Sequence, residues 1–96
     1  MIIKIDKKSF YRVLRKFPNI ERDFFKKLEK EVVKNYNNNN RKKVVLKDLK
    51  ELRGAYLFIS ISDKASTVEI SFTKKNLLRN SFIEGLIVNS KYFGDE

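Results

Sequence analysis

The chain has 96 residues with 22 Lys and Arg against 12 Asp and Glu, a formal net charge of +10, and neither Cys nor His. A chain of this length forms one domain around a single small core. The lack of Cys and His excludes a disulfide framework, a thiol nucleophile, the usual zinc sites and His-based acid–base catalysis. We expect one domain over residues 1–96 with no cofactor.

The distribution of charge indicates a class of partner. Residues 1–50 hold 16 Lys and Arg and 6 Asp and Glu, whereas residues 51–96 hold 6 of each kind. A one-sided positive field is typical of a protein that binds a polyanion, with nucleic acid favoured over an acidic protein or an anionic membrane surface. The start, MIIKIDKK, becomes charged too early for a signal peptide, and no apolar run approaches the roughly 20 residues of a membrane span. We expect a cytoplasmic protein without membrane contact.

The N-terminal half predicts a short strand followed by a helical hairpin. Ile2, Ile3 and Ile5 suit a strand, and Asp6 is a good N-cap for a helix over 7–17. Pro18 ends that helix, and Asn19 is predicted to cap the next. The buried stripe of the first helix consists of Phe10, Val13, Leu14 and Phe17, and its outer face carries Lys8, Arg12, Arg15 and Lys16.

A second helix is predicted over 20–36. Its inner row steps by four through Ile20, Phe24, Leu28, Val32 and Tyr36, with Phe25 and Val33 beside it. Its outer row is basic and consists of Arg22, Lys26, Lys30 and Lys34. These cations either form a solvated face that suits the helix dipole or contact a polyanion.

The four asparagines at 37–40 predict a loop, because Asn competes with helix formation through its own side-chain hydrogen bonds. Arg41, Lys42 and Lys43 follow it and suit phosphate contacts. We predict a short basic helix over 44–53, closed by Gly54 as its C-cap. That helix would bury Val45, Leu49 and Leu52 and expose Lys43, Lys47 and Lys50.

Residues 55–73 carry the clearest strand signal, two alternating runs around the short link 63–66, which predicts an antiparallel hairpin. Its inner face consists of Ala55, Leu57, Ile59, Ile61, Val68, Ile70 and Phe72. On the outer face, Tyr56 and Phe58 either stack on single-stranded bases or are covered by the C-terminal segment. Residues 76–88 suit a helix or a strand equally, and 91–96 are expected to be a frayed tail.

A basic helix that leads directly into a two-stranded hairpin resembles the recognition helix and wing of winged helix-turn-helix proteins, over roughly residues 19–73. That resemblance implies a helix in the major groove of double-stranded DNA, with Lys64 and Ser66 at the wing tip. It also implies an accessory or regulatory protein of a plasmid or phage, such as a transcription or conjugation factor. Such proteins often bind as homodimers.

The predicted elements follow one another as a strand, a helical hairpin, a basic linker, and then the run LKDLKELRGAYLFISISD followed by TVEISF. This order is similar to that of RelE/HigB-type toxins. That resemblance implies ribosome-dependent cleavage of messenger RNA and makes 82–88 a further strand, followed by Lys91 and Tyr92. Where that family usually carries an arginine, the chain reads Leu57, Phe58, Ile59 and Ser60. The missing arginine fits a degenerate relative that does not cleave RNA equally well.

We therefore expect an α+β fold, in which a helical hairpin and a short basic helix pack on an antiparallel hairpin, and a non-enzymatic double-stranded DNA-binding protein. The predicted DNA-binding residues are Arg12, Arg15, Lys26, Lys30, Lys34, Arg41, Lys42, Lys43, Lys47, Lys50, Arg53, Lys64 and Ser66.

Overall fold

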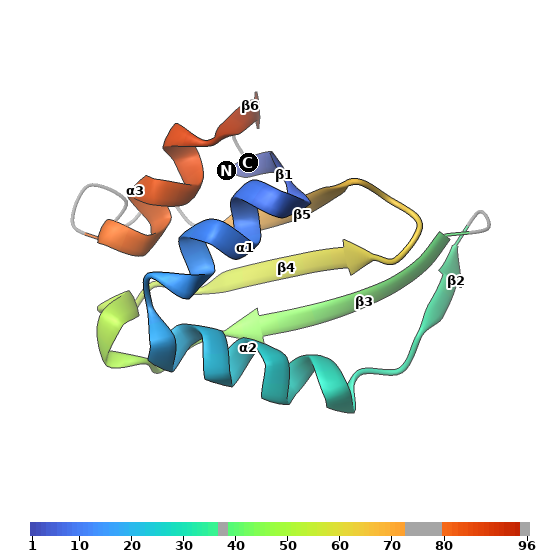
Figure 1. The fold of residues 1–96 in the computed structure, drawn as a ribbon, viewed down its shortest axis with the longest axis horizontal. Helices are drawn as coiled ribbons and strands as arrows, with labels where there is room; N and C mark the ends of the chain where they lie inside the picture. Colours follow the sequence, from blue (N-terminus) through green and yellow to red (C-terminus); the bar gives the residue numbers. More distant parts are fainter. Residues whose placement is uncertain (37–38, 73–79, 95–96) are drawn as a thin grey trace.

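The computed structural model describes residues 1–36, 39–72 and 80–94 and has an α+β fold. Its strands form one antiparallel sheet in the order β2-β3-β4-β5-β1-β6. Figure 1 shows the helices together on one face of this sheet. The strands are β1 (Ile2–Asp6), β2 (Lys34–Tyr36), β3 (Asn39–Leu46), β4 (Leu57–Ser62), β5 (Thr67–Phe72) and β6 (Ser90–Gly94). The helices are α1 (Lys7–Arg15), α2 (Pro18–Lys30), the 3₁₀ turn η1 (Lys50–Leu52) and α3 (Ser81–Val88).

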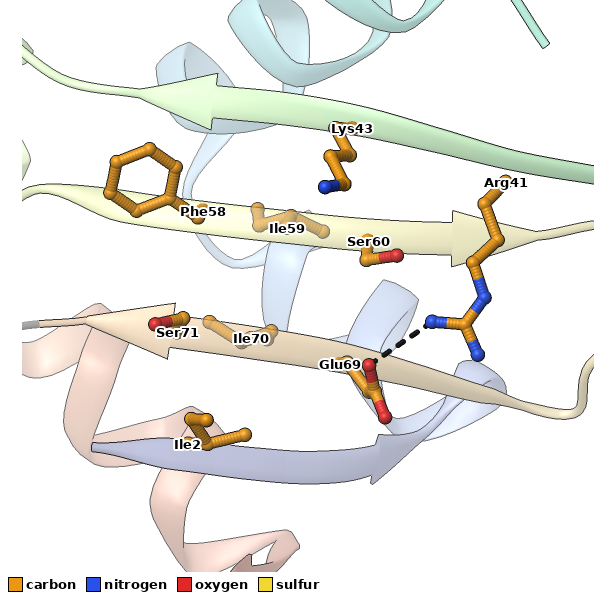
Figure 2. A pocket seen from close by; sticks show the side chains of 9 residues that line it. All are labelled: Ile2, Arg41, Lys43, Phe58, Ile59, Ser60, Glu69, Ile70 and Ser71. Atoms are coloured by element: carbon orange, nitrogen blue, oxygen red, sulfur yellow. Dashed lines mark hydrogen bonds and ion pairs between the residues drawn. The ribbon is translucent and has the colours of Figure 1, made fainter. Parts of the chain in front are cut away.

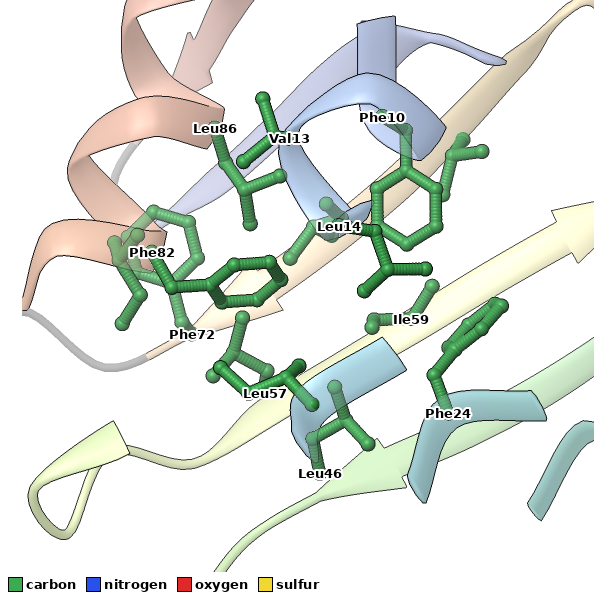
Figure 3. Close-up of a cluster of buried hydrophobic side chains, with 14 of the residues drawn as sticks. Phe10, Val13, Leu14, Phe24, Leu46, Leu57, Ile59, Phe72, Phe82 and Leu86 are labelled. Atoms are coloured by element: carbon green, nitrogen blue, oxygen red, sulfur yellow. The ribbon is translucent and has the colours of Figure 1, made fainter. Parts of the chain in front are cut away.

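The core lies between the sheet and the helices. Figure 3 shows Phe10 and Leu14 of α1 and Phe24 of α2 facing Leu57 and Ile59 of β4, and all five side chains are buried. Strand alternation and helical periodicity put these side chains on inward faces, as predicted. The helix α3 crosses α1 closely, and a Cβ at Gly85 would lie 3.2 Å from Cγ1 of Val13.

The N-terminal strand, the helical hairpin and the β4–β5 hairpin are confirmed. Asp6 caps α1 as predicted, because its Oδ2 accepts from the backbone N–H groups of Lys8 and Ser9. The prediction that Asn19 caps the second helix is wrong. Pro18 occupies the first turn, and Asn19 Nδ2 donates to Glu51 Oε1 at 2.7 Å instead.

The second helix is shorter than predicted. It ends at Lys30, and Glu31 is already extended at φ −78° and ψ 137°. Val32 and Val33 are 73% and 43% exposed, so the prediction that they are buried on a helix is wrong. Adjacent β-branched residues favour extended backbone, and β2 follows directly. Residues 37–38 of the predicted loop lie outside the described part of the chain, and Asn39 and Asn40 belong to β3.

The predicted basic helix over 44–53 is wrong. Its first residues continue β3, which pairs with β4 from Arg41 to Leu46, and only Lys50–Leu52 form a 3₁₀ turn. Asp48 and Arg53 have φ values of 59° and 50°, a conformation that interrupts an α-helix on both sides of this turn. The basic helix that carries the winged-helix resemblance is therefore absent, because residues 44–46 belong to β3 and 50–52 to a 3₁₀ turn.

The C-terminal segment also differs from the expectations. Residues 81–88 form α3, so the strand over 82–88 that the toxin resemblance implies is wrong. The prediction of a frayed tail is likewise wrong for residues 91–94, because they belong to β6, which pairs with β1. Residues 73–79 and 95–96 lie outside the described part of the chain.

Candidate nucleic-acid interface

The sheet face turned away from the helices, which we call the open face, contains cations and aromatic rings. Along β3, Val44 and Leu46 are buried in the core, so the alternating Arg41, Lys43 and Val45 point to the open face. Figure 2 looks onto this face, with the helices behind the sheet. Within the described ranges, no helix lies over it.

A row of paired residues crosses the open face from strand to strand. Lys43 pairs with Ser60, Ser60 with Glu69, Glu69 with Lys4, and Lys4 with Lys91. Because paired residues in an antiparallel sheet share one face, the row places three lysines beside a single carboxylate. Its net charge is therefore positive.

Two aromatic side chains form a ridge on the open face. Tyr56, just before β4, and Phe58 have ring centroids 4.8 Å apart with planes tilted by 50°. They are 37% and 49% exposed, so each ring leaves a substantial apolar area open to solvent. Lys47 Nζ lies 5.8 Å from the Tyr56 ring centroid, within cation–π range. We call Tyr56 and Phe58 the aromatic ridge.

On one side of the aromatic ridge is a hollow of about 300 Å³, the sheet-face hollow. Figure 2 shows the Phe58 ring at one end and Arg41 reaching across Ser60 to Glu69 at the other. Arg41 Nη1 lies 3.2 Å from Glu69 Oε2, and Lys4 Nζ lies 4.0 Å from Glu69 Oε1. The complete lining is Ile2, Arg41, Lys43, Phe58, Ile59, Ser60, Glu69, Ile70 and Ser71.

On the other side is a second hollow of about 400 Å³, the edge hollow, between the end of α2 and the edge of β3. Lys27 Nζ donates to Val45 O at 3.0 Å and lies 3.0 Å from Asp23 Oδ2, so this lysine covers the strand edge. The complete lining is Lys27, Lys30, Glu31, Val45, Lys47 and Tyr56.

The structure brings only some of the predicted binding residues together. Arg41 and Lys43 line the sheet-face hollow, and Lys30 and Lys47 line the edge hollow. Lys42 points toward the helical side, since it pairs with the buried Ile61.

The other predicted residues lie elsewhere. Arg12 and Arg15 are on α1, Lys26 is on the exposed side of α2, and the backbone of Lys34 is in β2, whereas its side chain lies outside what the structure describes. The remaining four divide between the η1 turn, with Lys50 and Arg53, and the β4–β5 turn, with Lys64 and Ser66.

Sequence reasoning missed Ile2, Lys4 and Glu69 as members of the same surface. The signal was present for β3, because Arg41 and Lys43 alternate with residues of a strand-like run. No pattern within β1 or β5 indicates that these strands are neighbours, because their pairing joins residues that are far apart in the sequence. Tyr56 and Phe58 point outward, as predicted. The C-terminal elements do not cover these two rings, because α3 packs against α1 and β6 pairs with β1.

The shifted pKa values belong to groups on the helical side. The Asn19 amide, a backbone N–H and the Lys50 charge lower the pKa of the Glu51 carboxyl. Burial, and to a lesser extent the Asp63 charge, raise the pKa of the Tyr11 hydroxyl, whose ring stacks on Phe25 with centroids 5.9 Å apart.

Residues 1–36, 39–72 and 80–94 hold no group of three or more Asp or Glu side chains placed to bind a metal ion. They also hold no helix that is long and apolar enough to span a membrane.

Comparisons with protein-family models, curated proteins and solved structures found no match to this chain.

Proposed function

We propose that this protein binds nucleic acid through the open face of its sheet. The observation that carries the proposal is the gathering of cations from separate elements around an exposed aromatic ridge. Arg41 and Lys43 lie on one side of the ridge, and Lys30 and Lys47 lie on the other. Phosphate groups need cations, and bases need apolar or aromatic surface, so the two features together favour a nucleic acid over a purely acidic protein.

The overall charge supports the same proposal. A net charge of +10 on 96 residues attracts any polyanion, and cations spaced along a strand and a helix end match a charged backbone. The double-stranded DNA predicted from the sequence remains a candidate ligand, but the proposed contact surface is the sheet rather than a recognition helix.

The test measures affinity for a labelled nucleic acid from 50 to 200 mM salt. Binding through phosphate contacts releases counterions, so the logarithm of the affinity should fall linearly with the logarithm of salt concentration. The variant Lys43→Gln/Lys47→Gln should lower the affinity and flatten the slope by about 1 per lost contact.

The matched control is Lys8→Gln/Lys16→Gln, which removes the same charge from exposed positions on and just after α1. It should keep most of the affinity and leave the slope nearly unchanged. Equal losses from the two double variants would show that only net charge matters and would overturn the open face as the contact surface. Absent or salt-insensitive binding would overturn nucleic-acid binding itself.

A second candidate is cleavage of messenger RNA, as the toxin resemblance implies. The observation that favours it is the element order, in which β1 and the α1–α2 hairpin precede antiparallel strands whose open face holds Arg41, Lys43 and Glu69. Induced expression of an active toxin should arrest growth and cut ribosome-bound message, and Lys43→Gln should relieve both effects. Normal growth with intact message would contradict this candidate.

A further inference from the structure

We infer that the ligand of the open face is a single strand, which crosses the edge of β3 with a base stacked on Phe58 and phosphates on both sides of the aromatic ridge. This inference rests on the proposed function and specifies the class of nucleic acid. It comes from the position of the ridge between two hollows that are both lined by cations.

The exposed rings argue for bases rather than phosphates at the centre of the surface. Phe58 is 49% exposed and Tyr56 is 37% exposed, and no described helix lies over either ring, although the Lys47 ammonium lies over the Tyr56 ring. Duplex DNA keeps its base faces stacked inside the helix and presents phosphates and groove edges to a protein. Only an unpaired base offers a face that can cover an aromatic ring.

The charges define how the backbone of such a strand passes over the ridge. On the sheet side, Arg41 bonds to Glu69, whereas Lys43 stands on the same rim with its side chain exposed. On the edge side, Lys27 bonds to Val45 O and Asp23, and Lys30 and Lys47 are exposed. Lys43, Lys30 and Lys47 are therefore the cations placed to hold phosphates on either side of the stacked base.

The size of the sheet-face hollow fits one base. Its volume of about 300 Å³ lies at the lower end of the range of small-molecule sites. Phe58 bounds it at one end, and the Arg41–Glu69 pair offers donors and acceptors at the other (Figure 2). A base that stacks on Phe58 can therefore direct its polar edge toward Arg41 and Glu69.

The experiment measures fluorescence anisotropy with labelled RNA and DNA single strands of about 12 nucleotides, a typical length for single-strand sites, and with the matching duplex. Both single strands should bind more tightly than the duplex. Binding of either sugar type supports the inference, because stacking and phosphate contacts are common to both.

The decisive variant is Phe58→Ala, and the matched control is Phe25→Ala, which removes a 39% exposed ring from the helical side. Phe58→Ala should lose about 5- to 150-fold in single-strand affinity, the effect of one stacked base, and change duplex affinity little. Phe58→Trp should retain the affinity, because it keeps a flat ring. Phe25→Ala should bind like the unchanged protein.

Two outcomes would overturn the inference and leave the proposed function standing. One is tighter binding of the duplex than of either single strand, and the other is equal behaviour of Phe58→Ala and Phe25→Ala while Lys43→Gln/Lys47→Gln still loses affinity. Failure of every nucleic acid to bind, with only an acidic protein or a second copy of the chain on this face, would overturn both.

Discussion

A single side-chain hydrogen bond joins the start of α2 to the η1 turn. Asn19 Nδ2 donates to Glu51 Oε1 at 2.7 Å, and this bond stabilises the charged carboxylate. It is the largest of the influences that lower the pKa of Glu51. The Asn80 side-chain amide donates to the backbone oxygen of Glu51, so Glu51 accepts hydrogen bonds from the first turn of α2 and from the N-cap of α3.

Asn19→Ala should raise the pKa of Glu51 toward its ordinary value, because the charged form loses its hydrogen bond. In the unchanged protein the bond contributes stability above that ordinary value, and the contribution is lost as the pH falls through the lowered pKa. The measurement is an NMR pH titration of the Glu51 carboxyl carbon. Lys50→Gln serves as the comparison and should raise the pKa less, since the Lys50 charge has a smaller effect than the Asn19 bond. A larger effect of Lys50→Gln would contradict this assignment.

Among the elements, β3 shows how tertiary pairing overrides a local pattern. Residues 44–53 satisfy a helical spacing, but Val44 and Val45 are β-branched and β4 offers a partner along six residues. Pairing with β4 adds ladder hydrogen bonds, and it places the side chains of Val44 and Leu46 in the core. Pairing as a strand therefore stabilises residues 44–46 more than a short isolated helix would.

The helix α3 depends on its N-cap. Asn80 is 1% exposed, its Oδ1 accepts from Ile83 N at 3.0 Å, and its Nδ2 donates to Glu51 O at 3.0 Å. Asn80→Ala removes the cap and leaves two backbone groups without their partner in a largely buried place. We expect the free energy of unfolding to fall by about 2 kcal/mol, measured by urea denaturation.

The control for the cap is Asn89→Ala at the other end of α3. Asn89 is exposed, and its Nδ2 donates to Gly85 O at 2.8 Å, so water can replace this bond. Its loss should cost less than about 1 kcal/mol. Equal costs for the two variants would contradict a structural role for the Asn80 cap.

At the scale of the whole molecule, residues 1–50 supply cations to both faces of the protein. α1 and α2 carry cations on the helical side, whereas β3 from the same half carries Arg41 and Lys43 to the open face. The +10 charge is therefore spread around the molecule, and the proposed site is distinguished by its aromatic ridge rather than by charge alone. Salt also screens the repulsion among these cations, so a loss of affinity at higher salt is not expected to come from unfolding.

The sequence alone determined the features that depend on neighbours along the chain. The alternation in 55–73 identified the hairpin and its two faces, the spacing of Phe10, Val13 and Leu14 identified a buried helical stripe, and Asp6 identified a helix start. These signals are local, because helical and strand periods appear within one turn or a few residues.

Only the tertiary structure decided the rest. β1 lies between β5 and β6, so Lys4 faces Glu69 and Lys91 across sequence separations of 65 and 87 residues. Residues 44–46 and 90–94 became strands because partners distant in the sequence were available for pairing. The open face unites residues of β1, β3, β4, β5 and β6. A local sequence period cannot specify which strands become neighbours, because burial of a common core fixes the pairing.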